Sequence, residues 1–193
     1  MFAKGFYEPV VIIYRIKSIY YSRGDFVKKL SLLFLFVLLF LTSCSSSPAP
    51  IARSFSAQVS ATSGTVDIKG KITANKENLF VAQVYSPNTM KGYTYTYKNS
   101  KLRMEYKGMI VDAEEGYLPD SAFPAVIYNV LKSLNKENNC YLSSSDNALA
   151  VYKGKSDSGD FILTAEFTTG AVKKIEVESI GFTAEFSNIK LIN

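Results

Sequence analysis

The residues that could carry out chemistry in this sequence are few. It has two cysteines and no histidine or tryptophan. Without histidine, neither a Ser-His-Asp nor a Cys-His catalytic arrangement can form, and no metal can be bound through imidazole. The adjacent carboxylates Glu114 and Glu115 would point to opposite faces of a strand, and Asp157 and Asp160 lie in a Ser/Gly stretch typical of a solvated turn. We therefore expect no enzyme and no metal or cofactor.

A short apolar run precedes the first cysteine. Residues 30–41 read LSLLFLFVLLFL and follow Lys28 and Lys29. A membrane-spanning helix needs about 20 apolar residues, so this run is too short to span and has the length of a signal-peptide core. The run is followed by Leu41-Thr42-Ser43-Cys44, which resembles a lipobox, the cleavage motif of bacterial lipoprotein signal peptides.

The lipobox resemblance implies three events at the cysteine. The Cys44 thiol receives diacylglycerol, the chain is cut between Ser43 and Cys44, and Cys44 becomes the first mature residue. Two or three acyl chains would hold the protein stably, at about 0.8 kcal/mol per buried CH₂ group. We expect a protein anchored on the extracytoplasmic face of the cell membrane, or of the outer membrane in a Gram-negative host. An uncleaved anchor helix is the alternative.

The leader, residues 1–43, has an unusual beginning, because residues 1–26 are long for the positively charged start of a signal peptide. We hypothesise that translation begins at Val27, since codons for Arg23-Gly24-Asp25 can form a purine-rich ribosome-binding sequence. A Val27 codon that cannot initiate would contradict this. After lipidation of Cys44, Cys140 is the remaining thiol, and we interpret it as a buried or neutral cysteine.

The net charge of +5 belongs mostly to the leader. Residues 1–43 hold six basic and two acidic groups, whereas residues 44–193 hold sixteen and fifteen. A nucleic-acid site requires a positive groove, so we expect no nucleic-acid partner. Small, polar and proline residues dominate positions 45–50, and we expect residues 44–54 to be a flexible tether.

Alternation of apolar and polar residues dominates the remaining domain, 55–193, and is typical of strands with one buried face. We predict about nine antiparallel strands. They cover residues 55–61, 66–72, 79–85, 93–98, 102–106, 148–152, 161–167, 171–179 and 182–191, with a short addition at 110–111. The strand at 79–85 has apolar residues on both faces, so we expect both faces to be covered. Residues 143–147 are predicted to form a loop.

A single segment, about 121–134, has helical periodicity. Asp120 or Ser121 could cap its start, and Pro124 falls in the first turn, where its missing N–H group costs little. A large curled sheet must close or cover its concave face. The predicted fold is therefore mainly β (α+β): a curled antiparallel sheet that forms a half-open barrel, covered by this helix.

Residues 80–134 resemble the Lol-type lipoprotein carriers (LolA/LolB-like proteins). The likeness rests on the order of Tyr85-Ser86-Pro87, Met90-Lys91-Gly92, a Tyr-rich strand, LRMEYKG and Leu118-Pro119 before the helix. It implies a half-open barrel with an apolar concave face, lidded by helices, that binds acyl chains of lipoproteins or related lipids. The tryptophan often seen early in the membrane-anchored branch is missing here.

Function is therefore expected at the concave face. We expect an apolar ligand, such as an acyl chain, a lipid or a lipoprotein, to bind beneath the helix. The alternative is an envelope protein-interaction module with a filled interior and no ligand, and its partner would be another envelope protein. The alternating residues Tyr93, Tyr95 and Tyr97 fit either a cavity lining or an ordinary sheet. The candidate cavity residues are Phe80, Val84, Leu102, Met104, Phe123, Ile127, Val130, Phe161, Leu163 and Phe167.

Overall fold

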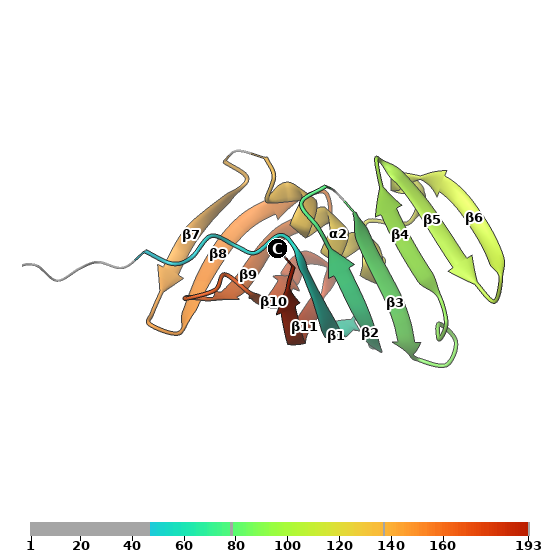
Figure 1. The fold of residues 1–193 in the computed structure, drawn as a ribbon, viewed down its shortest axis with the longest axis horizontal. Helices are drawn as coiled ribbons and strands as arrows, with labels where there is room; N and C mark the ends of the chain where they lie inside the picture. The colour runs from blue at the N-terminus through green and yellow to red at the C-terminus, as the bar shows by residue number, and fades with distance from the viewer. Residues whose placement is uncertain (1–46, 78, 137, 193) are drawn as a thin grey trace, which may run out of the picture. The chain divides into compact units, whose positions relative to one another are not determined.

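One antiparallel sheet and one α-helix form most of residues 47–77, 79–136 and 138–192, the part of the chain that the computed structural model describes (Figure 1). The first six strands are β1 (Phe55–Ser63), β2 (Val66–Ala74), β3 (Phe80–Ser86), β4 (Thr94–Lys98), β5 (Lys101–Tyr106) and β6 (Met109–Glu114). Then come helices η1 (Glu115–Tyr117, 3₁₀) and α2 (Phe123–Ser133). The last five strands are β7 (Cys140–Ser145), β8 (Leu149–Ser156), β9 (Gly159–Glu166), β10 (Val172–Val177) and β11 (Phe182–Leu191), with the 3₁₀ helix η2 (Glu178–Ile180) before β11.

The strand order explains why the sheet stays open. It runs β6-β5-β4-β3-β2-β1-β11-β10-β9-β8-β7, so β1 and β11 lie side by side at the centre. The first six strands follow one another from the centre of the sheet to the edge at β6. Helix α2 then connects β6 to β7 at the opposite edge, and the last five strands return to the centre. The two edge strands do not pair with each other, and the helix fills the curl between the halves (Figure 1). The predicted half-open barrel with one covering helix is confirmed.

Burial alternates along the strands and defines an inner face. In β1, Phe55, Ala57, Val59 and Ala61 are buried, while the residues between them are partly or fully exposed. The same alternation in β3 and β9 gives one continuous core on the side of α2. The outer face is exposed to solvent, and the Tyr85 side chain on this face is 49% exposed. The prediction that both faces of 79–85 are covered was therefore wrong, because apolar atoms also make up much of a normal protein surface.

The sheet has eleven strands where about nine were predicted. The loop predicted at 143–147 was wrong in its first part, since Ser144 and Ser145 pair with Val151 and Ala150 as part of β7. Serine has a low preference for strands, but an edge position needs backbone pairing with one neighbour only. The short addition at 110–111 is a full edge strand of six residues.

Helix α2 begins differently from the prediction. Its N-cap is Ala122, without a side-chain cap, and Pro124 lies in the first turn as expected. Asp120 does not cap the helix, because its carboxylate instead accepts a hydrogen bond from Asn129 Nδ2 at 3.2 Å. The apolar residues of α2 are buried along most of its length. The helix is therefore held in the curl by packing rather than by its cap.

Candidate functional site

The predicted cavity residues are brought together, but mostly as a filled core. Eight of them are at most 3% exposed, and Met104 and Phe167 are half-buried. The eight are Phe80, Val84, Leu102, Phe123, Ile127, Val130, Phe161 and Leu163. All eight belong to one apolar cluster between the sheet and α2. That they contact a ligand stays a prediction.

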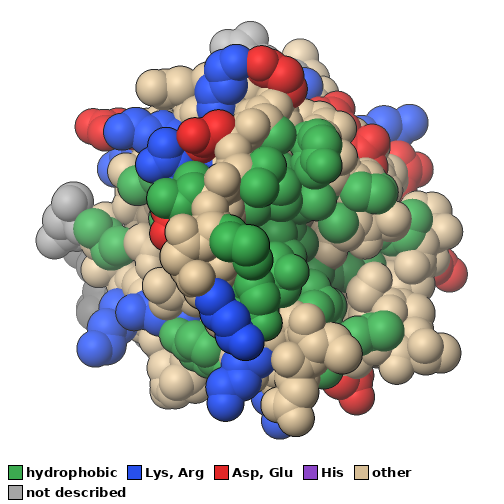
Figure 2. Space-filling model, turned by 90° about the vertical axis from the view of Figure 1, so that its right-hand side faces the viewer, with side chains coloured by type: hydrophobic (Ala, Val, Ile, Leu, Met, Phe, Trp, Pro, Cys, Tyr) green, Lys and Arg blue, Asp and Glu red, His purple; other side chains and the backbone are tan. Residues whose placement is uncertain are grey.

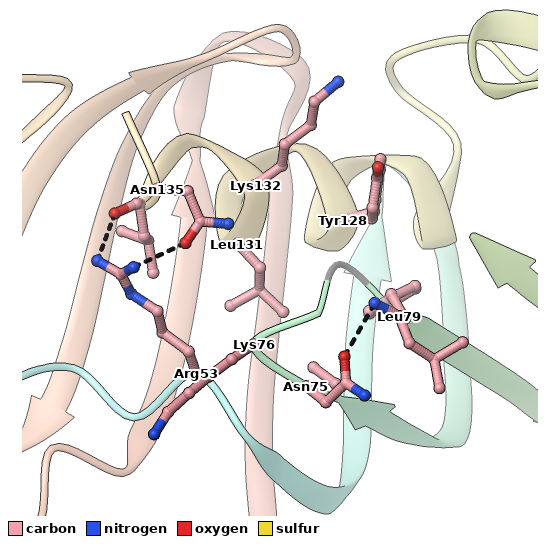
Figure 3. A pocket seen from close by; sticks show the side chains of 11 residues that line it. Arg53, Asn75, Lys76, Leu79, Tyr128, Leu131, Lys132 and Asn135 are labelled. Atoms are coloured by element: carbon pink, nitrogen blue, oxygen red, sulfur yellow. Dashed lines mark hydrogen bonds between the residues drawn. The ribbon is translucent and has the colours of Figure 1, made fainter. Parts of the chain in front are cut away.

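A small cavity lies beside α2 at the edge of this core (Figure 3). Its volume is about 30 Å³, which is about the space of one water molecule. Leu131 points from the helix into it, while Lys132 points away (Figure 3). Binding sites for small molecules are usually ten or more times larger. An acyl chain therefore has no room at this point of the inner face as it stands.

A larger groove lies next to this cavity, beyond the C-terminal end of α2. Its volume is about 720 Å³, within the usual range for ligand sites. We call it the tether groove. Its lining includes the chain from Pro48 to Arg53 together with Lys76, Leu134, Cys140, Leu142, Tyr152 and Thr169. Ile51, Cys140 and Tyr152 also pack against the apolar core, so the floor of the groove is the inner face of β7 and β8.

The wall of the tether groove is a chain segment expected to be loose. Ala49 N donates to Phe167 O at 2.8 Å, and Ala52 N donates to Gly170 O at 2.9 Å. Gly170 has φ +69°, and a Cβ atom there would lie 1.9 Å from Pro50 O. Only glycine permits both this backbone conformation and this approach. Residues 49–52, inside the predicted tether, are therefore held against the turn between β9 and β10.

Two cationic side chains line both the tether groove and the small cavity. They are Arg53 and Lys76. The Arg53 guanidinium donates to Leu134 O at 2.8 Å and to Asn135 Oδ1 at 2.8 Å (Figure 3). These contacts place a positive charge at the C-terminal end of α2, where carbonyl groups lack helical partners. An apolar groove with cations at its rim can hold an apolar chain that carries an anionic head.

The other end of the inner face is exposed and apolar. Beyond α2, it continues over the β6 shelf, which we define as Met90, Tyr93, Met104, Tyr106, Met109 and Val111. Met109 is 63% and Val111 48% exposed. The Tyr93 and Tyr106 rings stack with centroids 4.3 Å apart. Figure 2, which looks at this side of the molecule, shows hydrophobic side chains gathered in a continuous stripe between charged ones.

The three alternating tyrosines share the inner face, as predicted. Tyr95 is 8% and Tyr97 1% exposed, so they belong to the core rather than to an open cavity wall. Tyr97 stacks on Tyr128 of α2 with centroids 4.2 Å apart. Burial, and then the nearby Glu115, raise the pKa of Tyr128 to about 12. Among the described residues, the Tyr97 hydroxyl has no hydrogen-bond partner.

The adjacent carboxylates Glu114 and Glu115 form separate ion pairs, and of the two aspartates predicted in a turn, Asp157 lies in one while Asp160 belongs to β9. Glu114 pairs with Lys101 on the outer face, whereas Glu115 pairs with Lys132 of α2, so the two neighbours do not act together. Within residues 47–77, 79–136 and 138–192, no three Cys, Asp or Glu side chains are placed to hold a metal ion. Cys140 is half-buried, and burial raises the pKa of its thiol, so it is protonated at neutral pH.

The lipidation and cleavage positions, Cys44 and Ser43, lie outside the described residues, as does the leader. In the described part of the chain, no helix is long and apolar enough to cross a membrane. Sequence reasoning missed Ile51, Arg53, Lys76, Leu142 and Tyr152 as a group. They come from four separate segments, and only the folded sheet brings them together.

Comparison with solved structures supports the fold. A similar fold occurs in an uncharacterized conserved protein from Thermus thermophilus, with a TM-score of 0.50 and 10% identity over 74% of this chain and 80% of that chain. A structure of the CwlD amidase from Clostridioides difficile in complex with the GerS lipoprotein matches at a TM-score of 0.43, with 19% identity over 97% of this chain and 98% of that chain. The LolA superfamily protein NE2245 from Nitrosomonas europaea matches at a TM-score of 0.35, with 10% identity over 74% and 87%. The last two likenesses are too distant to carry an argument. No family model and no curated protein matches the sequence.

Proposed function

We propose that this protein is an envelope lipoprotein, anchored through Cys44, that binds an acyl chain with an anionic head group in the tether groove. The observation that carries this proposal is the groove itself: about 720 Å³ of space over an apolar floor, with Arg53 and Lys76 on its lining. The apolar floor would take the chain, since burying each CH₂ group contributes about 0.8 kcal/mol. The two cations would fix the position of the head group.

The proposal keeps the predicted ligand class and changes the position of the site. The ten residues predicted to line a cavity sit mainly in the filled part of the inner face. The tether groove lies farther along the same face, on β7 and β8. A second open pocket of about 1010 Å³ is lined by Phe161 together with polar and charged residues such as Lys153, Asp160 and Glu176. The ten residues would then form the rigid support behind the groove. The resemblance of residues 80–134 to Lol-type carriers supports the same class of ligand.

A binding titration with a fluorescent fatty acid tests the groove. Leu142 is 44% exposed and lines the groove, so Leu142→Glu should fold normally and weaken binding about tenfold or more, the equivalent of losing the burial of one leucine. Leu149, 40% exposed, lies outside the groove and serves as the matched control. Equal losses in Leu142→Glu and Leu149→Glu, or no binding by the wild type, would refute the proposed site.

The anchor needs a separate test, because the groove could be present without it. Mass spectrometry of the protein purified from membranes should find diacylglycerol on Cys44 as the first residue. Cys44→Ser should release the protein from the membrane and leave fatty-acid binding intact. An intact N-terminal leader on the membrane-bound protein would contradict lipidation without bearing on the groove.

A further inference from the structure

Strand β6 is an edge of the sheet, and of the features that usually protect such an edge it has charged side chains but neither a bulge nor a proline. Among the described strands it ends the strand order and pairs only with β5, in regular register over six residues. It contains no proline, and Met109, Ile110 and Val111 are 63%, 56% and 48% exposed. The opposite edge, β7, is interrupted by a register shift between Leu142 and Ser144. Bulges and prolines are common means of blocking edge pairing, so β6 is the more open of the two edges.

The turn before β6 determines which backbone groups are free. Lys107 and Gly108 both have positive φ, 48° and 83°, and Tyr106 pairs with Met109. This is the pattern of a two-residue hairpin turn, in which the closing pair is hydrogen-bonded. Because the direction of backbone groups alternates along a strand, the N–H and C=O groups of Ile110, Asp112 and Glu114 face away from β5.

The side chains next to this edge differ between the two faces. On the inner face, Met109 and Val111 continue the β6 shelf opposite Tyr106 and Met104. On the outer face, Asp112 accepts two hydrogen bonds from Arg103, at 2.7 and 3.1 Å, and Glu114 pairs with Lys101. On this outer face, β5 therefore carries the cations and the edge strand β6 carries the carboxylates. A further strand would complement these carboxylates with basic side chains.

We propose that β6 binds an extended segment of a partner protein by adding it to the sheet as a twelfth strand. The segment would carry apolar side chains on the inner face, over the β6 shelf, and Lys or Arg on the outer face, opposite Asp112 and Glu114. Its backbone would pair with the three residues whose polar groups face outward. This mode of recognition takes affinity from main-chain hydrogen bonds and specificity from alternate side chains. The site lies at the opposite edge of the sheet from the tether groove and does not depend on it.

Binding of labelled eight-residue peptides to the purified full chain tests the proposal. The first peptide alternates valine with lysine, the second alternates valine with glutamate, and the third is the lysine peptide with N-methyl groups on one side of its backbone. The lysine peptide should bind at least about tenfold more tightly than either of the others. Equal binding of the N-methylated peptide would exclude strand addition, and equal binding of the glutamate peptide would exclude the basic partner.

Two variants locate the site on the protein. Ile110→Pro removes an outward N–H group without removing a hydrogen bond to β5, so it should abolish peptide binding while Ile110→Thr retains it. Asp112→Asn with Glu114→Gln should weaken the lysine peptide several-fold and remove the salt dependence of its binding. Circular dichroism checks folding of each variant. Unchanged binding in Ile110→Pro would overturn the proposal. So would a dimer of the wild type in sedimentation that Ile110→Pro dissociates, because a second copy would then occupy the edge.

Discussion

The guanidinium of Arg53, just before β1, donates a hydrogen bond to the carbonyl oxygen of Leu134 at the end of α2, with 2.8 Å between the two atoms. The bond joins the start of the domain to the end of its only α-helix among the described residues. It also fixes the cation that lines the tether groove. Stability and ligand binding should therefore both depend on this side chain, and they can be separated.

Arg53→Ala should lower the free energy of unfolding by about 1–2 kcal/mol, because it removes charged hydrogen bonds from the end of α2. It should also weaken binding of a fatty acid more than binding of the fatty alcohol of the same length. Arg53→Lys should keep the preference for the acid and lose part of the stability. Urea unfolding and binding titrations measure the two effects. An unchanged acid-to-alcohol ratio in the Arg53→Ala, Lys76→Gln double variant would contradict the role of the cations.

Gly170→Ala should detach the wall of the tether groove. A Cβ atom at this position would lie 1.9 Å from Pro50 O, so residues 49–52 must move. Hydrogen exchange at the amides of Ala49 and Ala52, which donate to this turn, should become faster, and fatty-acid binding should weaken.

Gly64→Ala is the matched control for this change. Gly64 also has a positive φ, +59°, but nothing lies within 4 Å of its added Cβ. Both variants carry the same type of backbone strain, about 1–2 kcal/mol. Equal exchange at Ala49 and Ala52 in the two variants would show that strain alone, rather than the contact with Pro50, explains the effect.

Tyr97 of β4 and Tyr128 of α2, whose rings stack, should differ in how removal of the hydroxyl changes the stability of the domain. Tyr97→Phe should leave stability unchanged or raise it by up to about 1 kcal/mol, because its buried hydroxyl has no partner among the described residues. Tyr128→Phe should lower stability by about 1 kcal/mol, since its hydroxyl interacts with Glu115. Urea unfolding at neutral pH compares them. A loss in Tyr97→Phe as large as that in Tyr128→Phe would contradict this account.

Alkaline pH should lower the stability of the domain, because Tyr97 and Tyr128 are harder to deprotonate in the folded state than in the unfolded chain. In the folded state the pKa of Tyr128 is raised to about 12, above its usual value of 10.0, and burial also raises the pKa of Tyr97. Between pH 10 and 12 the unfolded chain therefore loses protons that the folded chain keeps, so stability falls as pH rises. Tyr128→Phe should flatten this decline. Tyr117→Phe, at an exposed position, should not, and an identical slope in all three proteins would contradict the assignment.

The sequence predicts the fold better than the site for a physical reason. Alternation along 55–61 and 66–72 reports burial of one strand face, and the structure confirms both strands. Alternation does not report pairing at an edge, so strand β7, Cys140–Ser145, was missed. Nor does it distinguish a filled inner face from an open one, since Leu102 and Val130 would be apolar in either case.

The tether groove depends on contacts that are remote in sequence. Its wall at 48–53 reads as a loose linker, because proline and small residues say nothing about the glycine turn that holds it. Gly170 follows Thr169 in an ordinary turn sequence, and only its approach to Pro50 reveals a second role. The distance of about 120 residues between the two segments explains why no local pattern predicts the groove.

Photo-crosslinking with a fatty acid that carries a diazirine near the end of its chain tests the central claim most directly. We predict labelling of residues 48–53 and 140–152 in the purified full chain, mapped by peptide mass spectrometry, and its loss when unlabelled fatty acid competes. Leu142→Glu should suppress the label, and Leu149→Glu should not. Labelling confined to the β6 shelf, or labelling that unlabelled fatty acid does not displace, would contradict a ligand site in the tether groove.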